Sequence, residues 1–214
     1  MYLTRIRINP HRRTSRKLLG SPQAMHAAVL GSYMDAPEPT SDVRVLWRAD
    51  IEERSVTLYV SSPTRPDTTY LREEAGWPEI PESAATVEYE SFLDRLEKGQ
   101  RWAFRLTANP VHHARRKDGE PTKALGHVTE RHQRQWLLDR GVKHGMELDP
   151  ETIAVRSSRT WQFARKDSTV SLRVATFDGI LEVADVDALR RMLCVGIGRA
   201  RGYGCGLMTL ANLA

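Results

Sequence analysis

Polar and apolar side chains alternate along residues 1–9, MYLTRIRIN, and this places Ile6 and Ile8 on the side opposite Arg7. A period of two is typical of a β-strand with one buried face. Pro10 ends the pattern, because proline cannot donate a hydrogen bond to a sheet. We therefore expect the chain to begin with a strand.

The next segment, residues 21–34 (SPQAMHAAVLGSYM), has the pattern of a helix. Ser21 is a preferred N-cap residue, and Pro22 suits the first helical position, where no backbone donor is needed. Apolar residues at helical spacing form one face, made of Met25, Ala28, Val29 and Tyr33.

The rest of the first half predicts strands over 42–50, 54–62 and 85–91. The proline-rich region between the last two permits only a short helix, near residues 68–76. The order is strand, helix, strand, strand, short helix, strand.

The second half begins with a similar passage. Residues 101–117 (RWAFRLTANPVHHARRK) resemble residues 2–17 (YLTRIRINPHRRTSRK): each has an alternating strand, then Asn-Pro, then a basic run. Such a repeat about one hundred residues apart indicates a duplicated domain, although two strand ends can also resemble each other by chance. A flexible charged loop is expected over 117–127.

A helix is predicted after that loop, with Thr129 as its N-cap and Gly145 at its end. Two long alternating runs within 152–183 are separated by turn residues at 166–168. A helix over 185–196 follows, with its apolar residues inward (Leu189, Met192 and Leu193), and a strand over 206–213 closes the chain.

Both halves thus read strand–helix–strand–strand–helix–strand. This is the ferredoxin-like order, so the expected fold is α+β with two tandem ferredoxin-like (RRM/RAMP-like, βαββαβ) domains. We place the domains at residues 1–92 and 100–214. The second carries a basic hairpin and a glycine-rich segment.

The glycine-rich segment is GIGRARGYGCG, residues 196–206. A dinucleotide-binding site requires a strand before such glycines and a helix after them, and here that order is reversed. No G-K-[ST] sequence occurs, which excludes a Walker phosphate loop. Two interpretations remain: a phosphate chain bound by bare backbone N–H groups with Arg199 and Arg201, or a helix-to-strand turn with both arginines in water.

Composition narrows the class of partner. The chain has 214 residues, a formal net charge of +5 and a pI near 9.4. Basic residues cluster at 11–17, 112–117, 156–166 and in the glycine-rich segment. Four clusters at loops or strand ends favour nucleic acid over a merely solvated basic surface.

Other features argue for a cytosolic protein without a membrane segment. No apolar run approaches the ~20 residues of a membrane span, and the N-terminus lacks the features of a signal peptide. The chain has only two cysteines, Cys194 and Cys205, which we expect to be reduced and largely buried thiols.

His26 is the residue best suited to proton transfer. It follows Met25 on the first predicted helix, about 100° round from it, and so lies at the edge of the apolar face. A partly exposed packing role is the alternative. The other histidines show no HExxH motif and no partner cysteines at zinc spacing, so no metal site is expected.

The sequence resembles the CasE-type CRISPR RNA-processing endoribonucleases of type I-E systems. The matching segments span nearly the whole chain, in the order found in that family: MYLTRIRINP, LLGSPQAMHAAVLGSY, VLWR at 45–48, FLDRLEKGQRWAFRLTANPV, HVTERHQRQWLL and GIGRARGYGCGLMTLA.

The resemblance implies a protein that binds the stem-loop of each CRISPR repeat and cuts precursor RNA at the base of the stem. It implies metal-independent chemistry without a cofactor, in which a ribose 2′-OH attacks the adjacent phosphate and leaves a 2′,3′-cyclic phosphate. The family's catalytic histidine falls on His26, as general base or general acid. Some relatives carry a tyrosine three residues earlier, where this chain has Gln23, which cannot transfer a proton at neutral pH.

The resemblance also implies partners: the repeat stem-loop, the mature crRNA and other subunits of the Cascade complex. A non-catalytic RAMP-type RNA-binding subunit of the same complex is the alternative, to which the missing tyrosine gives weight. The basic and glycine residues expected to bind RNA are Arg16, Lys17, Arg156, Arg159, Arg165, Lys166, Gly196, Gly198, Arg199, Arg201, Gly202 and Gly204.

The hairpin residues carry one geometric expectation. Side chains an odd number of positions apart point to opposite faces of a regular strand. Arg156 and Arg159 could therefore both face RNA only if a bulge interrupts the strand near Ser157 and Ser158.

Overall fold

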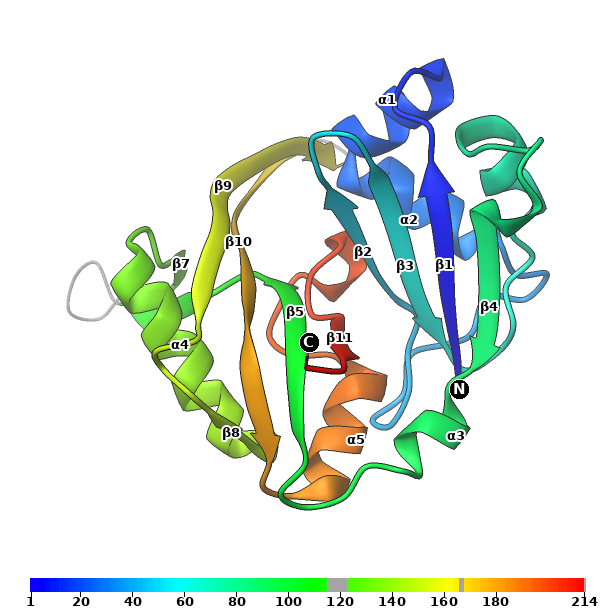
Figure 1. Cartoon of the computed structure of the whole chain (residues 1–214). Helices are drawn as coiled ribbons and strands as arrows, with labels where there is room; N and C mark the ends of the chain where they lie inside the picture. Colours follow the sequence, from blue (N-terminus) through cyan, green and yellow to red (C-terminus); the bar gives the residue numbers. More distant parts are fainter. Residues whose placement is uncertain (115–122, 166–167, 214) are drawn as a thin grey trace.

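The computed structural model describes residues 1–114, 123–165 and 168–213, which form an α+β fold with two main antiparallel sheets (Figure 1). The N-terminal sheet has the strand order β2-β3-β1-β4. Its strands are β1 (Tyr2–Ile8), β2 (Leu46–Ile51), β3 (Val56–Ser62) and β4 (Ala84–Glu88). These bounds confirm the four strands predicted for the first half.

The C-terminal sheet has the order β11-β5-β10, and β8 and β9 both pair with β10. Its strands are β5 (Arg101–Ala108), β8 (Met146–Leu148), β9 (Ala154–Arg165), β10 (Ser168–Val183) and β11 (Met208–Ala211). The short strand β8 was not predicted, because three residues are too few to show a period.

The helices are capped largely as the sequence predicts. They are α1 (Arg13–Gly20), α2 (Pro22–Leu30), α3 (Glu90–Leu93), α4 (Glu130–Lys143) and α5 (Val186–Val195). The Ser21 hydroxyl accepts the Ala24 N–H at 3.2 Å, with Pro22 in the first turn of α2. Short turns of helix occupy Leu71–Ala75, Pro81–Ser83 and Arg201–Tyr203.

Two segments expected to be loops are regular structure. The basic run at 11–17 is largely helical, because Ser15 and Leu18 share a buried face of α1 and the Ser15 hydroxyl donates to the Ala75 carbonyl at 2.8 Å. The expected loop at 117–127 includes β7 (Lys123–Gly126), which pairs with β6 (Val111–Ala114). Residues 115–122 lie outside the described part of the chain.

Each sheet has its own hydrophobic core. The buried residues of the first core come from residues 6–75, and those of the second come from residues 89–208. The buried residues therefore change from the first core to the second between Ala75 and Tyr89. The predicted inward face of α5 is confirmed, because Leu189, Met192 and Leu193 are all buried in the second core.

One buried arginine joins the two halves. Arg48 of β2 is 1% exposed and pairs with Asp50 through two hydrogen bonds, at 2.7 and 2.9 Å. Its guanidinium also donates to the carbonyls of Arg105 and Leu207 and to the Thr209 hydroxyl, all in the C-terminal half. Three of these five charge-assisted hydrogen bonds thus fix β2 against β5 and the start of β11, and the two to Asp50 hold the guanidinium in place within β2.

The β9–β10 hairpin is a second link between the halves. In Figure 1 it rises from the C-terminal sheet and arches toward α2 and β2. Phe163 of β9 packs on Tyr203 with ring centroids 4.8 Å apart. The hairpin, the glycine-rich segment and α2 therefore meet between the two sheets.

Within the described residues, no helix is long and apolar enough to cross a membrane. Both cysteines are free, as predicted: Cys205 is buried and Cys194 is half-buried. Burial raises the pKa of the Cys205 thiol to about 12, so this thiol remains protonated at neutral pH.

Candidate functional site

His26 lies on α2, beside the junction of the two halves. Met25 and Val29 of this helix are buried, and His26 is half-buried at the edge of the same face. The Nε2 side of its ring faces the glycine-rich segment, because a methyl group at Gly202 would lie 3.4 Å from that atom. Glycine at 202 thus allows the loop backbone to approach the imidazole.

The surroundings of the His26 imidazole favour its neutral form. Its Nδ1 atom is buried and has no hydrogen-bond partner among the described residues. Burial lowers the pKa of His26 below the ordinary value of 6.5. A neutral ring at pH 7 has one nitrogen that can accept a proton.

A hollow of about 220 Å³ opens beside His26. Its walls come from three parts of the chain: α2, residues 36–45 and the glycine-rich segment. Arg44 and Arg201 line it together, and Glu38 also contributes to its wall.

The two guanidinium groups enter this hollow from different halves of the protein. Arg201 is held by its own loop, since it donates to the carbonyls of Gly198 at 2.9 Å and Val195 at 3.1 Å. The Nε of Arg44 is buried and has no partner within the described chain. Burial first, and then the charge of Arg44, lower the pKa of Arg201. An anion between them would relieve this repulsion.

Arg44 is the residue of this hollow that sequence reasoning missed. It lies inside the alternating run at 42–50, where a polar residue reads simply as the outward face of a strand. The strand begins only at Leu46, so Arg44 belongs to the segment before it. A lone arginine in an apolar run, at the end of a proline-rich stretch, was the available signal.

Gln23 is exposed on α2, one turn before His26. Residues three apart on a helix are neighbours on its surface. Gln23 does not line the hollow, however, so its side chain would have to reach the reacting group from outside it. Its catalytic role stays a prediction.

The two basic residues predicted on the N-terminal segment are both on α1. Arg16 and Lys17 are exposed, and Arg16 donates to the His11 carbonyl at 3.1 Å. Helix α1 packs against α2, so these charges flank the helix that carries His26.

The glycine-rich segment combines packing with exposure. Gly196 and Gly204 are buried, and at Gly204, where φ is +79°, a methyl group would lie 2.6 Å from the Trp47 ring. Gly198 packs similarly against Trp136. Arg199 is exposed and carries no ion pair among the described residues. The loop therefore packs through its glycines and presents Arg199 to solvent.

The predicted strand interruption in the hairpin is present. The register between β9 and β10 shifts between Thr176 and Phe177, and Arg156 is the extra residue of the bulge. As a result, Arg156 and Arg159 line the same cavity, of about 410 Å³. Arg156 also pairs with Asp178 at 3.4 Å. The bulge lies one residue earlier than expected.

Arg165 and Lys166 are two further residues of the hairpin that we predict to contact RNA. Arg165 ends β9, but its side chain and all of Lys166 lie outside the described residues. Both stay predictions.

Three histidine rings gather at the start of α4 and on the β6–β7 hairpin. His127 lies 4.6 Å from His112 and 5.7 Å from His132 between ring centroids. Over residues 1–114, 123–165 and 168–213, no group of three or more His, Cys, Asp or Glu residues is placed to hold a metal ion.

Comparisons with known proteins agree in one family. Residues 1–212 match the protein family described as CRISPR associated protein. The chain is 28% identical over 226 residues to the CRISPR-associated endoribonuclease Cse3 of Thermus thermophilus, covering 99% of this chain and all of that one. It is 26% identical over 191 residues to the Cascade subunit CasE of Escherichia coli, covering 78% and 94% of the two chains.

A solved structure supports the same relationship. The structure of the CRISPR endoribonuclease Cse3 bound to a 19-nucleotide RNA matches with a TM-score of 0.77, at 25% sequence identity and 99% coverage of both chains. The likeness therefore extends over both sheets.

Proposed function

The chain belongs to the CRISPR-associated protein family in which Cse3 and CasE are its relatives, and we propose that it is an endoribonuclease that cuts precursor crRNA. Its substrate is the repeat stem-loop, which it cuts at the base of the stem without a metal ion. The observation that carries this proposal is the hollow in which the Nε2 side of His26, Arg44 and Arg201 converge.

The chemistry follows from a neutral imidazole beside two cations. His26 Nε2 accepts the proton of the ribose 2′-OH, and the 2′ oxygen attacks the adjacent phosphorus. The bond to the 5′ oxygen breaks, that oxygen takes a proton from water, the His26 imidazolium returns its proton to the solvent, and a 2′,3′-cyclic phosphate remains. Arg44 and Arg201 stabilise the negative charge that accumulates on the phosphoryl oxygens.

The proposed role of His26 predicts a pH dependence. With protein below saturation, the second-order rate constant of cleavage reports ionisation of the free protein. A general base acts only when unprotonated, so this constant should rise with pH up to the lowered His26 pKa and then stay level. The inflection should lie below about 6.5, the ordinary imidazole value.

The measurement is a single-turnover cleavage series across buffers of constant ionic strength. A constant that falls between about pH 5 and pH 7 would assign the imidazole the role of general acid instead.

The stem is held by the basic hairpin and by the glycine-rich segment. The deep major groove of an RNA helix hides its base edges, so protein side chains mainly contact its phosphates. Arg159 and Arg199 are both exposed and neither has a described ion pair, so each can neutralise a phosphate. Arg16 and Lys17 extend the basic surface along α1.

Salt dependence tests these contacts. We expect Arg159→Ala and Arg199→Ala each to weaken RNA binding and to flatten the plot of log K against log salt by about 0.7–0.9 per lost contact. Arg191→Ala, which removes an exposed arginine from α5, is the control and should leave the slope unchanged. Titrations of labelled RNA at several salt concentrations measure the slope. A slope that neither substitution alters would show that neither arginine contacts a phosphate.

We propose that the two halves are tandem ferredoxin-like domains, residues 1–92 and 100–214. Read from β4, the first sheet runs β4-β1-β3-β2, and the second runs β11-β5-β10-β9 in the corresponding positions. This equivalence supports a duplication. The active site then lies where the first domain meets the glycine-rich segment of the second.

We propose that the protein remains on the mature crRNA as a subunit of Cascade, as the name of its E. coli relative suggests. The competing candidate is a subunit that binds RNA without cutting it, and the exposed Gln23 at a tyrosine position favours it. Incubation of repeat RNA with the protein in EDTA separates the two. Cleavage with a 2′,3′-cyclic phosphate, identified by mass spectrometry, supports the enzyme; tight binding without cleavage supports the alternative.

A further inference from the structure

Another cavity lies beside α2 and opens between the two halves. Its volume is about 340 Å³, and its walls come from α1, α2, β2, β5, β9, β10 and the glycine-rich segment. Such a volume is at the low end for sites that hold small ligands. We call it the Trp161 cavity, after the aromatic ring in its wall.

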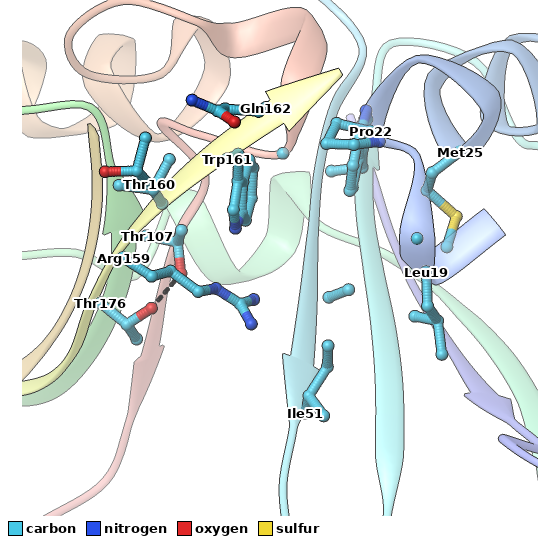
Figure 2. A pocket seen from close by; sticks show the side chains of 15 residues that line it. Leu19, Pro22, Met25, Ile51, Thr107, Arg159, Thr160, Trp161, Gln162 and Thr176 are labelled. Carbon is cyan, nitrogen blue, oxygen red and sulfur yellow. Dashed lines mark hydrogen bonds between the residues drawn. The ribbon is translucent and has the colours of Figure 1, made fainter. Parts of the chain in front are cut away.

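One wall is an aromatic ring with a cation beside it. Arg159 and Trp161 lie two residues apart on β9 and thus share a face, and the guanidinium carbon of Arg159 is 5.4 Å from the Trp161 ring centroid. Figure 2 shows both side chains extending from β9 into the space that Leu19, Pro22 and Ile51 close from the opposite side. Trp161 is half-buried, so part of its ring remains accessible.

The interior of the cavity offers polar groups at a few points. The hydroxyls of Thr107 and Thr176 bond to each other at 2.9 Å, which leaves one O–H free to donate (Figure 2). The indole Nε1 of Trp47, a buried lining residue, has no hydrogen-bond partner in the described chain. A slot with an aromatic wall, apolar side chains opposite it and polar groups between them suits a flat heteroaromatic group.

The cavity and the His26 hollow share two structural elements. Met25 lines the cavity and His26 lines the hollow, on adjacent positions of α2. In the glycine-rich segment, Gly204 lines the cavity and Gly202 lines the hollow. A helix with its side chains is about 10–12 Å across, so an RNA strand that passes His26 reaches the cavity within a few nucleotides.

From this geometry we infer that the Trp161 cavity binds one unstacked nucleobase of the RNA, close to the scissile linkage. The base stacks on Trp161, Arg159 contacts its phosphate, and the threonine pair bonds its edge. Aromatic side chains commonly hold splayed-out bases in this way. This inference rests on the proposed function, because it assumes that the scissile linkage lies at His26.

The test is a double-mutant cycle between protein and RNA. The RNA is the repeat hairpin with a 2′-deoxy sugar at the scissile nucleotide, which blocks cleavage, and with an abasic site placed in turn at each unpaired position near that linkage. Dissociation constants are measured for wild type, Trp161→Ala and Trp161→Phe. Tyr70→Ala is the control, because Tyr70 is 52% exposed and lies outside the cavity.

We expect one abasic position to weaken binding to wild type by roughly 5- to 150-fold, the range of base–aromatic stacking. Trp161→Ala should cause a similar loss with intact RNA and almost no further loss with that abasic RNA. Trp161→Phe should fall between, and the effects of Tyr70→Ala and of the abasic site should simply add.

If Trp161→Ala weakens every RNA by the same factor, or weakens none, no base occupies the cavity and the inference is wrong. Cleavage of the all-ribose RNA by wild type in EDTA is measured in parallel. Cleavage without coupling between Trp161→Ala and an abasic site would reject only the proposal that the cavity binds a base. Coupling without cleavage would reject the proposed endoribonuclease activity and would support the base site.

Discussion

Replacing His26 with alanine should lower the single-turnover rate of repeat-RNA cleavage by about 10²- to 10⁴-fold, the range that a positioned acid or base contributes. The remaining rate should no longer change with pH through the imidazole range. Binding of the RNA should change little, because a neutral, half-buried ring contributes no charge to the RNA-binding surface.

The control for this experiment is His113→Ala, which removes an exposed histidine of β6. It should cut at the wild-type rate. Rates are measured with protein in excess over RNA, and binding with the 2′-deoxy RNA, so that chemistry and affinity are separated. A His26→Ala protein that cuts normally would remove His26 from the mechanism.

Among the substitutions proposed here, replacing Arg48 with alanine should cause the largest decrease in the free energy of unfolding. Asp50, whose side chain is 10% exposed, would lose its bidentate partner, and two carbonyls of the C-terminal half would lose their donors. Breaking a buried pair by removing one member costs about 3–5 kcal/mol. The free energy of unfolding, measured by urea denaturation, should fall by that amount.

Two further variants keep this prediction testable even if Arg48→Ala does not fold. Arg48→Lys retains the charge but not the planar fork, and should recover part of the loss. Arg5→Ala removes an exposed arginine from the same sheet and should change stability by less than about 0.5 kcal/mol. Equal stability of Arg48→Ala and wild type would show that the three hydrogen bonds from Arg48 to the C-terminal half do not hold the halves together.

The same substitution should impair cleavage through geometry. His26 and Arg44 belong to the N-terminal half, whereas Arg201 and Gly202 belong to the C-terminal half. A site assembled from both halves requires a fixed orientation between them, and small displacements of catalytic groups are costly.

The repeated strand-helix pattern was predictable because each long element carries its own period and its own stop signal. Ser21 and Pro22 marked the start of α2, and Pro10 marked the end of β1, with no tertiary information. Helix α1 was missed because its eight residues bury only Ser15 and Leu18, too few to show a helical period among so many charges.

The catalytic candidate was predictable for its chemistry, but its surroundings were not. His26 was identified from its residue type, its place on the helix and the family resemblance. Arg44 and Arg48 read as ordinary outward residues of a strand, because alternation reveals which side a residue faces and not what covers that side. The side of β2 that carries Arg48 is covered by the other half of the chain. The residues that Arg48 contacts there are 57 or more positions away in the sequence, so local alternation cannot reveal them.

The structure of the protein with the 2′-deoxy repeat hairpin bound tests the central claim most directly. We expect the scissile phosphate in the hollow beside His26, with Nε2 within about 3.2 Å of the 2′ position or one water away from it, and with Arg44 and Arg201 on the phosphate oxygens. A scissile phosphate bound away from this hollow, with His26 touching no part of the RNA, would contradict the account.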